Sequence, residues 1–72
     1  MNYYQRIRDV REDHDLKQKD LAEILGTTQA MIWKYESGVT RMGIDKYIRM
    51  AQYFNISLDF LTGLTDEPRP LR

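Results

Sequence analysis

Apolar residues recur along this chain at the three- and four-residue spacing of amphipathic helices, and the first such stripe lies near the N-terminus. It predicts a helix over residues 3–13, with Asn2 as the N-cap and Gln5 three residues later as its capping-box partner. The apolar side of this helix is made by Tyr3, Ile7, Val10 and His14. The chain therefore begins with a helix that has one face to bury.

Two short helices follow, and the turn between them is unusually brief. A stripe ending at Leu25 predicts a helix over residues 18–25, with Gly26 as a left-handed C-cap. Thr28 can then cap a helix over residues 29–36, which ends before Gly38. Because only Gly26-Thr27-Thr28 separates the two helices, the chain must turn sharply, as it does in a helix-turn-helix.

The clearest apolar stripe comes later and predicts a fourth helix, with Asn55 as its C-cap. The positions expected to face the core are Ile44, Tyr47, Ile48, Ala51 and Phe54. Ser57 can cap a short fifth helix that Gly63 ends, and the segment from Thr65, with Pro68 and Pro70, is expected to be extended or disordered.

These elements describe an all-α fold of five helices, since no stretch alternates apolar and polar residues as a strand would. At 72 residues the chain has room for one small core. We expect a single helix-turn-helix domain over residues 1–64 and a tail over residues 65–72. No apolar run is long enough to span a bilayer, so the expected location is the cytoplasm.

The side-chain inventory argues against an enzyme. The sequence has no cysteine and a single histidine, His14, which we expect at the surface. It offers no nucleophile–base pair, no metal cluster and no phosphate-binding loop, so we expect no catalytic residue, metal, cofactor or small-molecule ligand.

The charge balance is neutral, with eleven basic and eleven acidic residues, which by itself weakens the case for a nucleic-acid partner. The basic and acidic residues are nevertheless expected to lie on different parts of the surface. We expect basic residues on one surface, namely Lys17, Lys19, Lys34, Arg41 and Lys46. We expect acidic residues toward the other end, namely Asp59, Asp66 and Glu67.

The helix predicted over residues 29–36 has two opposed faces, because an α-helix turns by about 100° per residue. The face that can pack on Leu21 and Leu25 is formed by Met31, Ile32 and Tyr35. The outward face, called the exposed face below, is formed by Gln29, Ala30, Trp33 and Lys34. Gln can bond adenine, Ala can touch a thymine methyl and Lys can bond guanine or phosphate, so this face suits a major groove. An ordinary solvated helix face is the alternative.

Residues 5–64 resemble the Cro/CI-type (XRE) repressor DNA-binding domain, a five-helix fold. The strongest similarity runs over residues 16–38, with Gln18 opening one helix, Leu21-Ala22 inside it, Gly26 at the turn and Glu36-Ser37-Gly38 ending the next helix. Met50-Ala51 and the segment 56–61 extend the similarity. The resemblance implies a sequence-specific transcriptional regulator that binds double-stranded DNA.

The same resemblance assigns roles to individual residues. Beyond base contacts by the exposed face, we expect phosphate contacts from Lys17, Gln18, Thr28, Arg41 and Lys46. Arg11 and Glu36 match positions that form a structural salt bridge. Trp33 departs from the small or polar side chain usual at its position, and it could pack on a neighbouring residue, lie on a sugar or touch a thymine methyl.

We also expect a symmetric homodimer, because one small module buries little DNA surface on its own. The residues expected at the dimer interface are Tyr53, Phe60, Leu61 and Leu64, with packing inside the monomer as the alternative. A repressor is the main hypothesis for function. The second hypothesis is an antitoxin or other regulatory module that uses the same fold to bind a protein partner.

Overall fold

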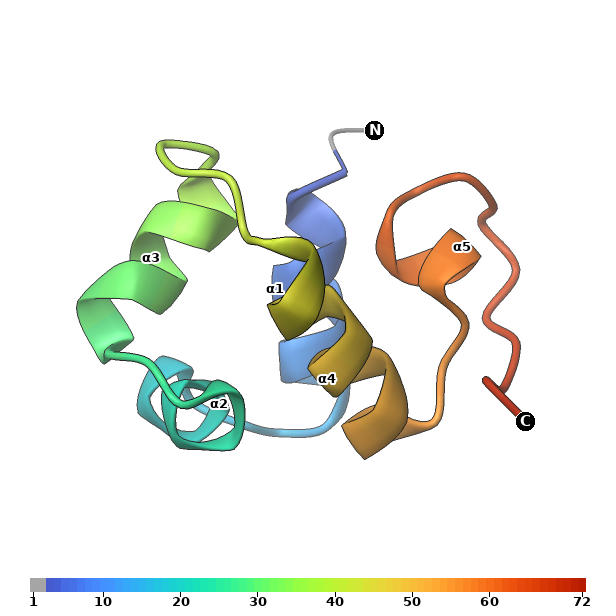
Figure 1. Ribbon diagram of the computed structural model, residues 1–72, viewed down its shortest axis with the longest axis horizontal. Helices are drawn as coiled ribbons and strands as arrows, with labels where there is room; N and C mark the ends of the chain where they lie inside the picture. The colour runs from blue at the N-terminus through green and yellow to red at the C-terminus, as the bar shows by residue number, and fades with distance from the viewer. Residues whose placement is uncertain (1–2) are drawn as a thin grey trace.

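The computed structural model describes residues 3–72, which fold into the five helices predicted from the sequence (Figure 1). Their bounds are α1 Gln5–Asp13, α2 Gln18–Leu25, α3 Gln29–Ser37, α4 Ile44–Phe54 and α5 Leu58–Leu61. The all-α fold is thus confirmed. Within the described residues, no helix has the length and apolar character needed to cross a membrane.

Every helix contributes one of the largest fully buried side chains of the core. These are Ile7, Leu21, Ile32, Met50 and Leu61. Burying aliphatic side chains of this size stabilises the fold by about 1.5–3 kcal/mol each. Since each helix contributes one of them, no helix can be removed without opening the core.

The first helix begins later than predicted. Tyr4 is its N-cap and makes no side-chain capping hydrogen bond, and Tyr3 precedes the helix and is 41% exposed. The predicted cap, Asn2, lies outside the described residues. The prediction of a start at residue 3 was therefore wrong by two residues.

The turn between α2 and α3 has the predicted geometry. Gly26 adopts φ +69°, a left-handed conformation that a side chain would disfavour. Thr28 Oγ1 accepts a hydrogen bond of 3.2 Å from the backbone N–H of Met31, so Thr28 caps α3 as expected. This turn sets the angle between the two helices.

Gly38 ends α3 for two reasons. Its φ of +79° is left-handed, and a Cβ at this position would lie 2.6 Å from the ring of Tyr4. The chain leaves α3 in close contact with the residue that precedes α1, so a glycine is required here.

The fourth helix buries only part of the predicted stripe. Ile44 and Ile48 are 65% and 41% exposed, whereas Met50 is fully buried beside Tyr47 and Ala51. Tyr47, Ala51 and the partly buried Phe54 belong to the predicted stripe, and Met50 joins them in place of Ile44 and Ile48. The assignment of Ile44 and Ile48 to the core was wrong because two stripes of similar apolar character compete on this helix.

The segment after α5 is more ordered than an unattached tail. Its backbone pairs antiparallel with the residues after α4, through hydrogen bonds from Ser57 N–H to Arg69 O at 2.8 Å and from Leu71 N–H to Asn55 O at 3.3 Å. Pro70 lies between the two bonds, at a position where the pairing does not require a backbone N–H. This segment and α5 lie on one side of the molecule and α3 lies on the other (Figure 1).

Candidate nucleic-acid interface

The two faces of α3 are divided as the angular spacing predicted. Ile32 and Tyr35 are buried and Met31 packs partly against the core. The exposed face comprises Gln29, Ala30, Trp33 and Lys34, all of them exposed in the structure. Helix α3 therefore has one buried side and presents polar, small and cationic side chains on the other.

The N-terminus of α2 lies close to the end of α3. The Gln18 side chain donates from Nε2 to Glu36 Oε1 at 3.3 Å, which fixes it between the two helices. Lys17 is exposed, and its backbone N–H donates to Asp20 Oδ2 at 2.9 Å. The carboxylate of Asp20 thus accepts a hydrogen bond at the start of α2. The ammonium of Lys17 cannot accept one from the helix backbone, as a serine or threonine cap would.

An ion pair connects α1 with the last turn of α3. Arg11 donates from Nε to Glu36 Oε2 at 2.7 Å and from Nη2 to Oε1 at 3.0 Å, with exposures of 12% and 5% for the two side chains. Its Nη1 donates to Leu16 O at 2.8 Å. The hydrogen bonds that Arg11 donates to Glu36 raise the pKa of Arg11 above its ordinary value. These residues therefore meet as the resemblance implied, and α3 is fixed to α1 and to the turn before α2.

Trp33 is not packed into the core, since 54% of its surface is exposed. Its ring forms part of the lining of a hollow next to the exposed face. The hollow is lined by Arg8, Arg11, Gln18, Trp33, Glu36 and Ser37. Trp33 therefore lies outside the core, and part of its ring is accessible to a ligand.

The loop before α4 is anchored by an apolar residue. Met42 is 6% exposed and Arg41 beside it is exposed. Gly43 is the N-cap of α4 and makes no side-chain capping bond. Lys46 in the first turn is partly buried, with Nζ 3.8 Å from Asp45 Oδ2. Arg41 is therefore exposed to solvent, while the charge of Lys46 is partly offset by the carboxylate of Asp45.

The residues predicted for a dimer interface lie in different environments. Tyr53 and Leu64 are 61% and 80% exposed, and Phe60 is partly buried. Leu61 has no exposed surface, because its side chain fills the core below α1 and α4. The assignment of Leu61 to an interface was wrong, since a core residue cannot contact a second copy.

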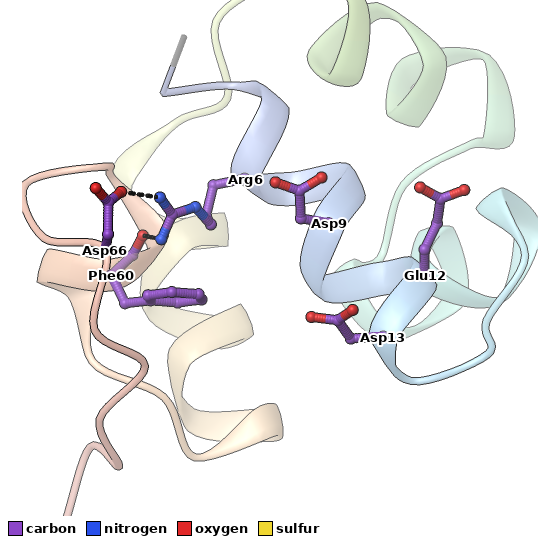
Figure 2. A pocket seen from close by; sticks show the side chains of 6 residues that line it. All are labelled: Arg6, Asp9, Glu12, Asp13, Phe60 and Asp66. Carbon is purple, nitrogen blue, oxygen red and sulfur yellow. Dashed lines mark hydrogen bonds and ion pairs between the residues drawn. The ribbon is translucent and has the colours of Figure 1, made fainter. Parts of the chain in front are cut away.

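Arg6 is a structural residue that the sequence pattern gave no reason to select. Only 3% of it is exposed, and its Nη1 donates to Phe60 O at 3.1 Å and to Thr65 O at 3.2 Å. Its Nη2 contacts Asp66 Oδ1 at 2.9 Å, and its guanidinium lies 4.1 Å from the centre of the Phe60 ring (Figure 2). Arg6 therefore joins α1 to α5 and to the segment beyond it.

Acidic side chains gather in another part of the surface, along α1. Asp9, Glu12, Asp13 and Asp66 line an open pocket together with Arg6 and Phe60 (Figure 2). Among residues 3–72, no three histidine or acidic side chains are grouped so as to hold a metal ion. The pocket therefore offers a negatively charged surface and no arrangement of metal ligands.

Comparisons with known proteins agree with this geometry. Residues 7–61 match a family model described as helix-turn-helix. The chain is 35% identical over 68 residues to an uncharacterized HTH-type transcriptional regulator, YobD, of Bacillus subtilis (strain 168), a match that covers 94% of this chain and 61% of that protein. The chain thus spans about three fifths of the length of this relative.

Two solved structures share the fold. A transcriptional regulator from Listeria innocua superposes with a TM-score of 0.81 at 34% identity, over 90% of this chain and 61% of that one. The P22 c2 repressor, solved with a synthetic operator, superposes with a TM-score of 0.76 at 21% identity, over 85% of this chain and 92% of that one. The helical arrangement described above is therefore that of a λ-repressor-like helix-turn-helix domain.

Proposed function

Because the chain belongs to the Cro/CI-type (XRE) helix-turn-helix family of transcriptional regulators, we propose that it is a repressor that binds double-stranded DNA through the exposed face of α3. The observation that carries this proposal is the division of α3 into a buried side and a polar exposed side at the surface of the molecule. A B-DNA major groove admits one α-helix, and it presents base edges that such side chains can bond.

Three residues of the exposed face have side chains that suit contacts with particular bases. Gln29, in the first turn of α3, can donate to N7 and accept from N6 of adenine. Ala30 can contact a thymine methyl, and Lys34 can donate to guanine or to a phosphate. Residues at the N-terminus of a recognition helix reach the base edges first, so Gln29 is the residue on which specificity depends most.

The phosphate contacts are proposed around this helix. Gln18 stands at the N-terminus of α2, where free backbone N–H groups and the helix dipole favour an anion. The remaining residues proposed to contact phosphates are Lys17, Thr28, Arg41 and Lys46. A phosphate beside Gln18 would lie next to the Arg11–Glu36 ion pair, which holds the Gln18 amide in place.

The acidic pocket beside α1 favours one orientation of the protein on DNA. A phosphate backbone is repelled by the carboxylates of Asp9, Glu12, Asp13 and Asp66, which line this one pocket (Figure 2). A chain of zero net charge can therefore favour one side for contact with DNA.

The proposed assembly is a two-fold homodimer, which would place two recognition helices about 34 Å apart on successive major grooves. Tyr53 and Leu64 are the exposed apolar residues toward the C-terminal end, and Phe60 is partly accessible there. A dimer bound over a promoter would act by excluding other proteins from that DNA. We place this activity in the cytoplasm, where bacterial DNA is found.

The test is a selection of bound duplexes from a random DNA library by the purified protein. We expect a two-fold symmetric sequence with half-sites one helical turn apart, together with a protein dimer on DNA in sedimentation experiments. Binding should weaken as salt rises, with a slope of about 0.9 for each phosphate contact. Recovery of no sequence, combined with a stable complex with another protein, would favour the second hypothesis of a protein-binding module.

A further inference from the structure

A hollow beside the exposed face of α3 is lined by residues of three helices. Arg8 and Arg11 from α1, Gln18 from α2, and residues of α3 meet there. The α3 residues are Trp33, Glu36 and Ser37. Arg11, Gln18 and Glu36 are engaged with one another. The Ser37 hydroxyl donates to the backbone of its own helix, at Trp33 O. Arg8 and Trp33 are left to be explained.

The engaged residues carry little net charge. Arg11 and Glu36 neutralise each other through two hydrogen bonds, and the Gln18 amide donates to the same carboxylate. Arg8 is different, since it is 59% exposed and pairs with Glu12 at 3.2 Å on its own helix. An exposed ion pair of this kind contributes little stability, so a phosphate can compete for the guanidinium.

Trp33 lies on the same face of α3 as Gln29, but farther from the N-terminus of the helix. It follows Gln29 by one helical turn, and base edges are contacted by the N-terminal residues of such a helix. Its ring shares the hollow with Gln18, which stands at the α2 N-terminus proposed to bind a phosphate. Beside a bound phosphate, an exposed indole can pack on the neighbouring deoxyribose.

We infer that this hollow receives the sugar–phosphate backbone of DNA, with the Trp33 ring packed on a deoxyribose and the Arg8 guanidinium bonded to an adjoining phosphate. The inference rests on the proposed function and changes the role of Trp33 from base contact to backbone contact. It also adds Arg8 to the residues that contact DNA. A backbone contact strengthens binding to every sequence and does not select one.

The first experiment uses the emission of Trp33, which is the single tryptophan of the chain. The selected duplex and a scrambled duplex of equal length are titrated into the full chain while a label on the DNA reports binding independently. We expect both duplexes to shield Trp33 from acrylamide quenching once they are bound. Binding reported by the DNA label without any change in Trp33 accessibility would overturn the inference and leave the proposed function intact.

The second experiment separates backbone contact from base contact. Trp33→Ala should weaken binding to both duplexes by a similar factor of about tenfold, because the apolar contact with sugar is lost from each. If Trp33 instead touched a thymine methyl, the loss would be confined to the selected duplex and the inference would be wrong. Thermal unfolding of the variant should match the wild type, since Trp33 lies outside the core.

The third experiment tests Arg8 with a matched control. Arg8→Gln should lower the slope of log affinity against log salt by about 0.9, the loss of one phosphate contact. Arg69→Gln removes another exposed arginine, one that pairs with Glu67 at 2.7 Å in the C-terminal segment, and should leave the slope unchanged. Equal slopes for Arg8→Gln and the wild type would contradict the contact, and failure of the wild-type protein to bind any duplex would overturn the proposed function as well.

Discussion

Arg11 and Glu36 form a two-hydrogen-bond ion pair that fastens the recognition helix α3 to α1, with N–O distances of 2.7 and 3.0 Å. The planar guanidinium fixes the orientation of the carboxylate, which a lysine could not do. Since Gln18 also donates to Glu36, this one carboxylate of α3 is bonded to residues of α1 and α2. The geometry of the proposed DNA contacts therefore depends on a pair that need not touch a base.

Glu36→Gln should lower the free energy of unfolding by about 3 kcal/mol, because it leaves the Arg11 charge largely buried without an anion. Urea denaturation monitored by circular dichroism measures this change. Arg11→Met in the Glu36→Gln background should recover part of the loss, since the buried charge is then absent.

The control for that measurement is the Arg8–Glu12 pair, whose side chains are 59% and 53% exposed. Glu12→Gln should change stability by less than about 0.5 kcal/mol. Equal effects for Glu12→Gln and Glu36→Gln would contradict the structural role given to the buried pair.

Arg6→Lys should detach the C-terminal segment from α1. Lysine keeps the charge but cannot reach Phe60 O, Thr65 O and Asp66 together, and the loss of these hydrogen bonds should cost about 2 kcal/mol. Amide hydrogen exchange should then accelerate at Ser57 and Leu71, whose N–H groups are bonded in the paired segments.

Arg69→Lys provides the comparison, because Arg69 is exposed and its Nη2 contacts only a carboxylate two residues away among the bonds described here. This variant should leave the exchange of Leu71 near the wild-type rate. Protection that survives Arg6→Lys unchanged would show that Arg6 does not hold the segment.

Tyr47→Phe should stabilise the protein by about 1 kcal/mol. The Tyr47 hydroxyl is buried and has no hydrogen-bond partner among the described residues, so its removal relieves a desolvation cost. Burial raises the pKa of Tyr47 above its ordinary value of 10.0, which means that folding favours the protonated form. Wild-type stability should therefore fall as the pH rises above 10, because the unfolded chain ionises Tyr47 more readily than the folded one.

Chemical denaturation at a series of pH values from 8 upward tests this prediction. The difference between Tyr47→Phe and the wild type should grow above pH 10, where the wild-type chain must either keep the proton or unfold. A constant difference across that range would be inconsistent with the burial of the hydroxyl.

Local signals in the sequence were sufficient for the helices and for the face of α3. Gly26 and Thr28 fix the turn through a left-handed backbone and a cap, and both effects act within a few residues. The division of α3 follows from helical geometry and from the apolar character of Ile32 and Tyr35. These features depend on residues that are close together in the sequence, so they can be predicted from it.

Features that depend on distant parts of the chain could not be predicted in this way. Two apolar stripes compete on α4, and contacts with the other helices decide that Met50 is buried and Ile44 is exposed. The burial of Arg6 depends on carbonyl groups more than fifty residues away, and Leu61 was assigned to an interface because its apolar character does not reveal which surface covers it. The hollow beside Trp33 likewise needs three helices in place.

Gln29→Ala is expected to relax base preference without unfolding the protein. The side chain is exposed, so its truncation should leave the unfolding midpoint unchanged. Loss of a bidentate contact with adenine should reduce discrimination at one position of each half-site by about 1–3 kcal/mol, while affinity for a scrambled duplex stays nearly constant. Gln52→Ala on the exposed side of α4 is the matched control and should retain the wild-type preference. An unaltered selected sequence for Gln29→Ala would mean that specificity resides elsewhere on α3, with Lys34 as the next residue to test.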